Sequence, residues 1–361
     1  MSGEGRIGSK ITIGVTGMNA TDNPAPGIGV IRCLLADKTK NFHIVGMAYD
    51  VYDTGIYDEG LLDDVYLVPF PNEGAENLLN RIKKIHSDVK LDVIIPTLDS
   101  ELRVYQQIEK SLNEMGIALL LPSVEKVELR SKMKLSDFCE KNKINTPKTI
   151  VLRSTGEIEK AIEELSLPLV IKGIFYEAFI CKTVDDVFTS FHKIANKWGL
   201  PIIAQEFLHG NEYDICCVGN RDGKLIGAVP IRKIGLTDKG KAWSAVTIAD
   251  KKLMALSEKT IEALGWVGPC ELEFLKDEKT GEFYLLEINP RFPAWIFLSS
   301  GVEQNLPIAA VKIALGEDIP KMQPAKSGVT FVRHATDMIC QMERIEKLTI
   351  YGELHFGNDK L

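Results

Sequence analysis

The sequence lacks the features of membrane and nucleic-acid-binding proteins. It has no apolar run close to the roughly 18 residues of a membrane-spanning helix, and no basic tract longer than a few residues. The formal net charge is −7, with acidic and basic residues mixed along the chain, so neither a nucleic acid nor an anionic membrane is supported as a partner. The first ten residues are polar with no apolar segment behind them, which argues against a signal peptide. We expect a cytoplasmic protein.

Two further absences narrow the classes of protein. The seven cysteines include no CxxC pair, and we interpret them as small buried side chains in a reducing compartment. Gly14-x-x-Gly17 and Gly27-Ile28-Gly29 do not form GxGxxG, which argues against a nicotinamide-dependent dehydrogenase.

The length of 361 residues predicts two to three domains at about 150 residues each. Up to about residue 122, amphipathic stretches separate short apolar runs, which predicts a parallel sheet wound on both faces. The expected strands are Ile11–Val15, His43–Ala48, Val65–Val68, Val93–Ile95 and Ala118–Leu121. Ligands of such sheets lie beyond the carboxyl ends of the strands, where residues 23–27 and 96–101 are either plain turns or part of a pocket.

The remaining chain predicts an α+β fold. Residues 123–200 mix helices and strands, and residues 201–290 are mostly strand with one helix at Asp250–Leu264. We therefore predict an α/β domain at 1–122, a small subdomain at 123–200, and a carboxyl-terminal subdomain at 201–361 with an antiparallel sheet.

Residues 271–275 and 285–291 are predicted to form a hairpin around a turn at 277–281. Because strand side chains alternate between faces, the polar side chains share one face and Leu286 and Ile288 pack on the other. The shared face carries Glu271, Glu273, Glu287, Asn289 and, if the strand continues past the proline, Arg291.

This set of side chains suits a magnesium site. Two carboxylates about 4 Å apart repel by about 1 kcal/mol in bulk water, and a bridging cation removes that cost. Mg²⁺ takes one or two carboxylates and fills its shell with phosphate oxygens and water. We predict Glu273, Glu287 and Asn289 as ligands of Mg²⁺, with Mn²⁺ as the alternative metal, and Arg291 as a contact of a transferring phosphoryl group. The alternative is an exposed, solvated hairpin in which Arg291 pairs with a glutamate.

The order of the motifs resembles the ATP-grasp superfamily, and in particular its branch of carbamoyl-phosphate-synthetase-like and amino-acid-ligase-like proteins. The resemblance runs from about residue 120 to 315, and the amino-terminal domain looks like the pre-ATP-grasp domain of that family. It rests on Lys132, Pro147-Lys148-Thr149, Leu169-Val170-Ile171-Lys172, Gln205 to Glu212, Glu273 and Glu287-Ile288-Asn289-Pro290-Arg291. The resemblance implies an ATP-grasp fold that binds ATP and Mg²⁺.

Carried over residue by residue, the resemblance implies a nucleotide site. Lys132 and Lys172 would contact the ATP phosphates, although a lysine that ends a strand is often only solvated. Glu212 would accept hydrogen bonds from the ribose hydroxyls. The hinge segment would hold the adenine edge through backbone groups, with two of its side chains as apolar lining: Gln205, Glu206, Phe207 and Leu208.

One segment departs from the family pattern. Most members carry a glycine-rich loop that covers the phosphates, whereas residues 172–178 of this chain, Lys-Gly-Ile-Phe-Tyr-Glu-Ala, contain a single glycine. The phosphate lid is therefore expected to be short or differently built, which also fits a member without catalytic activity.

Between the hinge and the acids lies a basic loop, residues 231–243. Arg232 and Lys233 are candidates for holding phosphoryl oxygens or a substrate carboxylate, whereas Lys239 and Lys241 are read first as a solvated turn. Pro293 and Trp295 would wall the substrate pocket or belong to the core. Asp99 and Glu101 would bind an amine or mark a helix amino terminus.

The resemblance implies an ATP-dependent carboxylate–amine ligase that acts through an acyl phosphate on an amino acid or a peptide-like small molecule. It also implies a homodimer. The alternative function is an ATP-binding accessory or sensor protein without ligase turnover.

Overall fold

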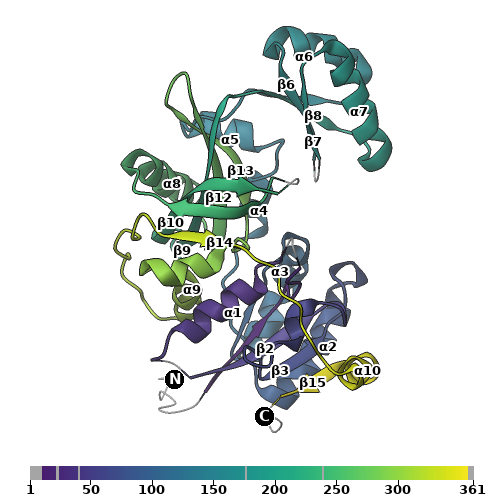
Figure 1. Cartoon of the computed structure of the whole chain (residues 1–361), viewed down its shortest axis with the longest axis vertical. Helices are drawn as coiled ribbons and strands as arrows, with labels where there is room; N and C mark the ends of the chain where they lie inside the picture. The colour runs from purple at the N-terminus through teal and green to yellow at the C-terminus, as the bar shows by residue number, and fades with distance from the viewer. Residues whose placement is uncertain (1–9, 22–23, 40, 175–176, 238–239, 357–361) are drawn as a thin grey trace.

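The computed structural model describes residues 10–21, 24–39, 41–174, 177–237 and 240–356. These residues form three sheets of five, six and four strands. Figure 1 shows the five-stranded sheet at the bottom, the six-stranded sheet in the middle and the four-stranded sheet at the top.

The first sheet is a parallel sheet wound on both faces. Its parallel strands are β1 (Ile11–Val15), β2 (Phe42–Ala48), β3 (Asp64–Leu67) and β4 (Val93–Ile95). One core packs helix α1 (Gly27–Ala36) against the sheet, and a second core packs helices α2 (Ala75–Val89) and α3 (Asp99–Glu114) against its other face. Because both faces are buried, the strands are nearly continuous apolar runs, which made them visible in the sequence.

The fifth strand of this sheet differs from the prediction. Residues 118–121 form no strand, and Ala118 makes only an isolated bridge with Val93. The fifth strand lies at the opposite edge of the sheet, beside β3. It is β15 (Glu353–His355), which follows helix α10 (Met342–Tyr351) and pairs antiparallel with β3. Residues at the end of the chain thus complete the first sheet.

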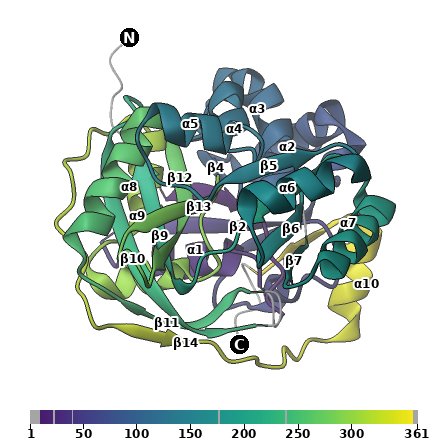
Figure 2. The same cartoon turned by 90° about the horizontal axis from the view of Figure 1, so that it is seen from above.

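The four-stranded sheet is antiparallel and has the order β5-β8-β6-β7. Helices α4 (Val124–Leu129) and α5 (Leu135–Lys141) lead into it, and helices α6 (Ile158–Leu165) and α7 (Val184–Trp198) pack on it, as seen from above in Figure 2. Its strands are β5 (Thr149–Leu152), β6 (Leu169–Gly173), β7 (Ala178–Cys181) and β8 (Ile202–Glu206).

The six-stranded sheet is also antiparallel, with the order β13-β12-β9-β10-β11-β14. Helix α8 (Lys251–Leu264) begins at Asp250, whose carboxylate accepts hydrogen bonds from two backbone N–H groups of the first turn. The strands are β9 (Gly210–Gly219), β10 (Leu225–Leu236), β11 (Ala242–Thr247), β12 (Gly268–Asp277), β13 (Phe283–Asn289) and β14 (Thr330–Val332).

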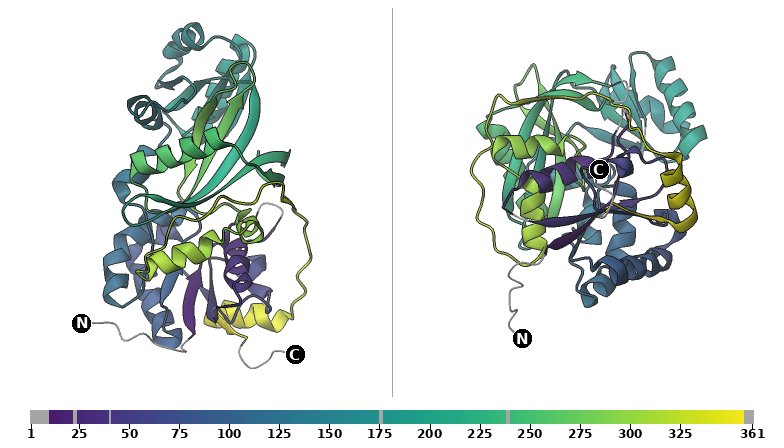
Figure 3. Two further views of the ribbon diagram at one scale, coloured as in Figure 1. Left: turned by 90° about the vertical axis from the view of Figure 1, so that its left-hand side faces the viewer. Right: turned by 60° about the horizontal axis from the view of Figure 1, so that its bottom comes forward.

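One hydrophobic core joins the first sheet to the six-stranded sheet. It contains side chains of β1 and α1 together with those of the 3-10 helix η4 (Ile296–Val302), helix α9 (Leu306–Ala314) and strands β9 and β10. After α9 the chain runs along the outside of the molecule and returns to the first sheet through α10, as Figure 3 shows. The two sheets that carry the site described below are therefore packed together.

The predicted domain boundaries at 122 and 200 stay predictions. They would assign strands β8 and β15 to the carboxyl-terminal subdomain, but both strands belong to other sheets. β8 begins at Ile202 and completes the four-stranded sheet, and β15 belongs to the first sheet.

All seven cysteines are free, and six of them are buried, with Cys340 half-buried. This agrees with their interpretation as small apolar side chains. In the part of the chain that the structure describes, no helix combines the length and the apolar character needed to cross a membrane.

Candidate active site

The predicted hairpin is formed by β12 and β13, and it brings the acids and the amide together. Glu273 lies opposite Glu287 and Glu271 lies opposite Asn289. The Asn289 Nδ2 donates to a carboxylate oxygen of Glu273 at 2.8 Å. Directly opposite side chains on paired strands are close neighbours, so the register places two carboxylates and an amide in one cluster.

A β-bulge interrupts the hairpin beside this cluster. Glu273 pairs with Glu287 and Phe274 pairs with Leu285, so Leu286 has no partner on β12. The expectation that Leu286 packs in the core on the opposite face is wrong, because it lines the cavity that Lys132 and Lys172 also line. Bulges redirect side chains in this way and are frequent next to active sites.

Glu271 holds two side chains in place. One of its carboxylate oxygens accepts from the Trp295 Nε1 at 2.8 Å, and the other accepts from the Arg291 Nη1 at 2.8 Å. The buried Trp295 lines a large cavity between the first sheet and the six-stranded sheet, which is described below, and it also belongs to the hydrophobic core. It is therefore both a pocket wall and a core residue, the two alternatives that the sequence left open. With its oxygens engaged in this way, Glu271 orients Arg291.

Arg291 also contacts the first domain. Its Nε lies 3.2 Å from the Asp99 Oδ1, and the Arg130 Nη1 lies 3.5 Å from the other oxygen of Asp99. Burial alone would lower the pKa of Arg291, but the charges of Glu271 and Asp99 outweigh it and raise the pKa. Arg291 is therefore a cation fixed by carboxylates from both domains.

Glu101, by contrast, is fully buried and is not among the residues that line the cavity of Asp99. It accepts from the Leu98 N–H at 2.8 Å and the Thr97 N–H at 2.6 Å at the start of α3, and from the hydroxyls of Thr16 and Tyr49. The structure thus gives Glu101 the helix-terminus role, and Asp99 the contact with Arg291.

Lys233 lies in a cluster of acids on β9 and β12, with only 6% of its side chain exposed. Its Nζ is 2.9 Å from Glu212, 3.1 Å from Asp214 and 3.4 Å from Glu273. Burial alone would lower its pKa, but these carboxylates raise it. Lys233 is therefore charged and lies next to the predicted metal ligands.

Asp214 was missed in the sequence. It follows Glu212 by two residues on β9 and so lies on the same face, which is the signal that could have revealed it. Burial and the charge of Glu273 raise the pKa of Asp214.

The other residues of the basic loop are divided between the two faces of β10 and the turn that follows. Arg232 is exposed and is not among the residues that line the cavity, whereas Lys241 lines it. Lys239 lies outside the described residues. A further cation, Arg333, follows β14 and also lines the cavity. It was missed because no local pattern ties its segment to the site. Burial lowers the pKa of Arg333.

The predicted metal ligands fit a hard cation in their chemistry. Burial and the charge of Glu273 raise the pKa of Glu287, with Lys132 and Lys172 opposing. Burial would also raise the pKa of Glu273, but Lys233 and Arg291 outweigh it and lower the pKa. A divalent cation would relieve the repulsion between these carboxylates. No group of three or more His, Cys, Asp or Glu side chains suited to a metal ion occurs among the described residues, so the set consists of two carboxylates and an amide.

The predicted phosphate contacts Lys132 and Lys172 lie on one narrow cavity together with Gln205 and Leu286. The Lys132 Nζ donates to the Gly173 carbonyl oxygen at 3.3 Å. Burial and the charge of Lys132 lower the pKa of Lys172, while Glu287 and Glu273 oppose this. Two neighbouring cations with no carboxylate within ion-pair distance among the described residues suit a phosphate chain.

The predicted adenine segment is the connection between two sheets. β8 ends at Glu206, whose N–H donates to the Lys148 carbonyl oxygen at 2.9 Å. Phe207 and Leu208 follow as a half-buried link to β9. Gln205 is buried, and its side chain donates to the Thr149 Oγ1 at 3.0 Å. Gln205 lines the cavity of Lys132 and Lys172, and the binding of adenine by this segment stays a prediction.

Of the single-glycine segment, Phe175 and Tyr176 lie outside the described residues. Glu177 accepts from the Lys197 Nζ at 2.8 Å and the Trp198 Nε1 at 3.0 Å, which ties β7 to α7.

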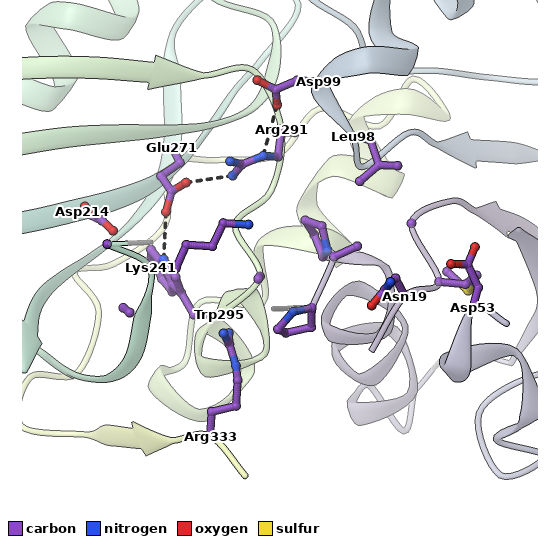
Figure 4. Close-up of a pocket in the computed structure, with 18 of the residues that line it drawn as sticks. Asn19, Asp53, Leu98, Asp99, Asp214, Lys241, Glu271, Arg291, Trp295 and Arg333 are labelled. Carbon is purple, nitrogen blue, oxygen red and sulfur yellow. Dashed lines mark hydrogen bonds and ion pairs between the residues drawn. The ribbon is translucent and has the colours of Figure 1, made fainter. Parts of the chain in front are cut away.

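A cavity of about 440 Å³ lies between the first sheet and the six-stranded sheet. Figure 4 shows Arg291, Glu271, Lys241 and Arg333 on the side of the six-stranded sheet, and Asn19 and Asp53 on the side of the first domain. The first-domain residues that line the cavity follow the carboxyl ends of β1, β2, β3 and β4, as the position of ligands in wound parallel sheets predicts.

Comparison with known proteins gives a match of one part of the chain to a family model, and a fold. Residues 200–337 match the model of a family described as ATP-grasp in the biosynthetic pathway with Ter operon. The chain is 21% identical over 300 residues to the carbamoyl phosphate synthase large chain of Kocuria rhizophila. The match covers 76% of this chain and 26% of that protein. The chain thus spans about a quarter of the length of this relative.

Two of the solved structures that resemble this chain cover 88% of it. One is the biotin carboxylase domain dimer of Hydrogenobacter thermophilus 2-oxoglutarate carboxylase in complex with MgADP, ADP and bicarbonate, with a TM-score of 0.67, 15% identity, and 88% of this chain and 73% of that chain covered. The other is N5-carboxyaminoimidazole synthetase from Staphylococcus aureus complexed with ADP, with a TM-score of 0.66, 15% identity, and 88% and 81% covered. These likenesses confirm the predicted fold class.

Proposed function

We propose that this chain, which is a member of the ATP-grasp superfamily, is an ADP-forming ligase that joins a carboxylate to an amine. The observation that carries the proposal is the register of β12 and β13, which places Glu273 opposite Glu287 beside Asn289 and the fixed cation Arg291. Glu273 and Arg291 line the cavity of about 440 Å³, and Leu286, the residue before Glu287, lines the cavity of Lys132 and Lys172. A phosphate donor and an acceptor can therefore meet at one point.

Glu273, Glu287 and Asn289 would hold Mg²⁺, or Mn²⁺ in its place, through carboxylate and amide oxygens. When bound, the metal would neutralise negative charge on the phosphates of ATP. The raised pKa of Glu287, caused by burial and by the neighbouring Glu273, supports a cation at this place.

The side chains of this protein would act by position and charge. Lys132 and Lys172 would hold the ATP phosphates, and Arg291 would face the γ-phosphoryl group. In the first step a carboxylate oxygen forms a bond to the γ-phosphorus and the bond to the β-phosphate oxygen breaks, which gives an acyl phosphate and ADP. In the second step the nitrogen of an amine attacks the acyl carbon, the amine gives up a proton, and phosphate leaves.

The rest of the nucleotide would bind along β8 and β9. Backbone groups of Glu206, Phe207 and Leu208 would meet the adenine edge, and Glu212 would accept from the ribose hydroxyls. Lys233, which already contacts Glu212 and Glu273, would connect the ribose end of the site with the metal end.

The carboxylate substrate would lie in the large cavity. Arg333 lines this cavity with a partly buried guanidinium, and no carboxylate lies within ion-pair distance of it among the described residues. An arginine in such a place can pair with a carboxylate through two parallel, coplanar hydrogen bonds.

The test is release of ADP and phosphate from Mg-ATP in the presence of pooled amino acids and dicarboxylic acids, with mass spectrometry of the mixture. Release that requires one acid and one amine is the expected result. Nucleotide binding without release from any pool would contradict the ligase proposal and favour the ATP-binding accessory or sensor protein.

Three expectations from the sequence belong to the same proposal: a homodimer, a cytoplasmic location, and small molecules as the only partners, with neither nucleic acid nor membrane among them. Sedimentation of the purified chain at several concentrations tests the first, because a concentration-independent monomer would contradict it.

A further inference from the structure

Arg291 is held on two sides by carboxylates that come from different parts of the chain (Figure 4). Its Nη1 donates to Glu271 of the hairpin at 2.8 Å, and its Nε lies 3.2 Å from the Oδ1 of Asp99 in the first domain. The third nitrogen, Nη2, donates to no residue that the structure describes. Because a guanidinium is planar, contacts at two of its nitrogens fix the direction in which the third one points.

Asp99 occupies a well-fixed place in the first domain. It is the first residue of α3. The backbone just before it is fixed by the fully buried Glu101, which accepts from the N–H groups of Thr97 and Leu98. The hydroxyl of Thr16, which follows β1, donates to the same carboxylate and so ties the start of α3 to the first sheet. The position of Asp99 is therefore set by the core of the first domain.

The other oxygen of Asp99 reaches toward the strand of the predicted metal ligands. It lies 3.5 Å from the Nη1 of Arg130, and the same nitrogen donates to the Ile288 carbonyl oxygen at 3.4 Å. Ile288 stands between Glu287 and Asn289 on β13. Asp99 therefore connects the first domain with the backbone between two predicted metal ligands.

We infer that Asp99 is a positioning residue of the phosphoryl-transfer site: together with Glu271, and from the first domain, it aims the Nη2 of Arg291 at the γ-phosphoryl group. The inference rests on the place that the proposed function gives to Arg291, and it adds that the first domain takes part in holding the reaction centre. Fixed, correctly aimed charges stabilise a transferring phosphoryl group, so a small rotation of the guanidinium weakens this contact.

The charge of Asp99 acts in the opposite direction to its positioning role. A carboxylate beside Arg291 lowers the attraction of the site for a phosphate, so removal of the charge alone would strengthen the binding of a γ-phosphate. Loss of the positioning contact would weaken the same binding. The two roles of Asp99 therefore predict changes of opposite sign, and one measurement of nucleotide affinity separates them.

The test measures how strongly the full chain prefers a nucleotide that carries a γ-phosphate. Calorimetry with Mg²⁺ gives the dissociation constants of ADP and of a non-hydrolysable ATP analogue, and we call the first divided by the second the γ-phosphate preference. Asp99→Ala is expected to lower this preference at least about fivefold, with the affinity for ADP changed by less than about twofold. Equal losses for both nucleotides, which leave the preference unchanged, would overturn the inference. A higher preference, which the charge alone predicts, would overturn it as well.

A conservative variant and a control locate the effect. Asp99→Asn removes the charge but keeps an oxygen for Arg291, so its γ-phosphate preference should lie between those of the wild-type protein and Asp99→Ala. If melting curves show that Asp99→Ala does not fold, a wild-type or higher preference in Asp99→Asn would overturn the inference. Asp185→Ala is the matched control, because Asp185 also stands in the first turn of a helix, α7, but is exposed on the four-stranded sheet. It should keep the wild-type preference, and a loss equal to that of Asp99→Ala would contradict a specific role of Asp99.

A second test asks whether Asp99 acts through Arg291. Arg291→Lys keeps the charge but not the planar set of nitrogens, and it is expected to lower the γ-phosphate preference by itself. In this background Asp99→Ala should change the preference by less than about twofold, because the nitrogen that Asp99 positions is gone. A full fivefold loss in both backgrounds would show that Asp99 acts independently of Arg291 and would overturn the inference. A wild-type preference in Arg291→Lys would overturn it too.

The outcomes separate this inference from the proposed ligase activity, because the γ-phosphate preference is measured without turnover. A lower preference in Asp99→Ala, with no release of ADP by the wild-type protein from any pool, supports the positioning role and contradicts the ligase. Release of ADP that requires an acid and an amine, with an unchanged preference in Asp99→Ala, supports the ligase and contradicts the positioning role.

Discussion

Lys233 and Glu212 form an ion pair across neighbouring strands, with the Nζ 2.9 Å from a carboxylate oxygen. Lys233 also lies 3.1 Å from Asp214 and 3.4 Å from Glu273. One buried cation thus contacts the predicted ribose acceptor, an acid that the sequence did not reveal, and a predicted metal ligand. Its substitution is expected to disturb both ends of the nucleotide site.

Lys233→Met should lower the free energy of unfolding by about 3 kcal/mol at neutral pH, because it leaves buried carboxylates without their cation. The loss should shrink as the pH falls and these carboxylates become protonated. Chemical denaturation at several pH values measures it. Arg232→Met is the comparison, because Arg232 is exposed on the same strand, and its change should stay within about 0.5 kcal/mol. Equal losses in both variants would contradict the placement of Lys233.

Glu287→Gln should lower the rate of substrate-dependent ADP release by at least about a hundredfold, while the fold remains intact. Because burial and Glu273 raise the pKa of Glu287, removal of its charge should leave the melting temperature unchanged or raise it. Glu278→Gln, in the turn of the same hairpin, is the control and should keep full activity. Full activity of Glu287→Gln would contradict the assignment of Glu287 as a metal ligand.

The hairpin was predictable because its pattern is local. Strand side chains alternate between the two faces of a sheet, so Glu271, Glu273, Glu287 and Asn289 lie side by side on one face of the hairpin, independent of the rest of the fold. The bulge at Leu286 was not predictable, because an extra residue on one strand is defined only by the register of its partner. The same limit applied to Arg232 and Lys233. Residues 225–231 of β10 are buried on both faces, so their pattern does not show which face of the strand meets the cavity.

Pairings between strands that are far apart in the sequence were not predicted, for a related reason. β15 is three residues long and joins β3 from a distance of almost 290 residues. Arg333, which lines the large cavity, directly follows an equally short strand, β14. Such strands carry too few residues for a periodic signal. Asp50 and Asp53, however, follow a predicted strand, and the rule that ligands lie beyond carboxyl ends of parallel strands could have found them.

Arg333→Ala should lower kcat/KM for the carboxylate substrate by about ten- to a hundredfold, because a charged hydrogen-bonding partner in a partly buried site is lost. Nucleotide binding should not change, since Arg333 lines the large cavity and not the cavity of Lys132 and Lys172. Arg333→Lys should recover only part of the loss, because lysine cannot form the two parallel hydrogen bonds of a guanidinium. An unchanged KM for the carboxylate in both variants would remove Arg333 from the substrate site.

Asp64 connects the end of the chain to the first sheet. Its carboxylate contacts the His43 Nε2 and lies 2.6 Å from the His355 Nδ1 on β15. Burial alone would raise the pKa of Asp64, but the hydrogen bonds from both histidines outweigh it and lower the pKa. The resulting stability is therefore fully present above the ordinary carboxyl pKa of 3.8 and is lost as the pH falls through the lower value of the folded state.

Asp64→Asn should for this reason destabilise β15 at pH 7. The difference in the stability of β15 between the variant and the wild-type protein should decrease as the pH falls below the ordinary carboxyl range. Hydrogen exchange of the backbone amides in β15 and β3 measures the effect locally. Asp185→Asn, at an exposed position of α7 on the four-stranded sheet, is a suitable control because it removes the same charge outside the first sheet. Faster exchange confined to β15 and its neighbour would support the connection through Asp64. Exchange at wild-type rates in Asp64→Asn would show instead that the three backbone pairings of β15 with β3 hold the strand without it.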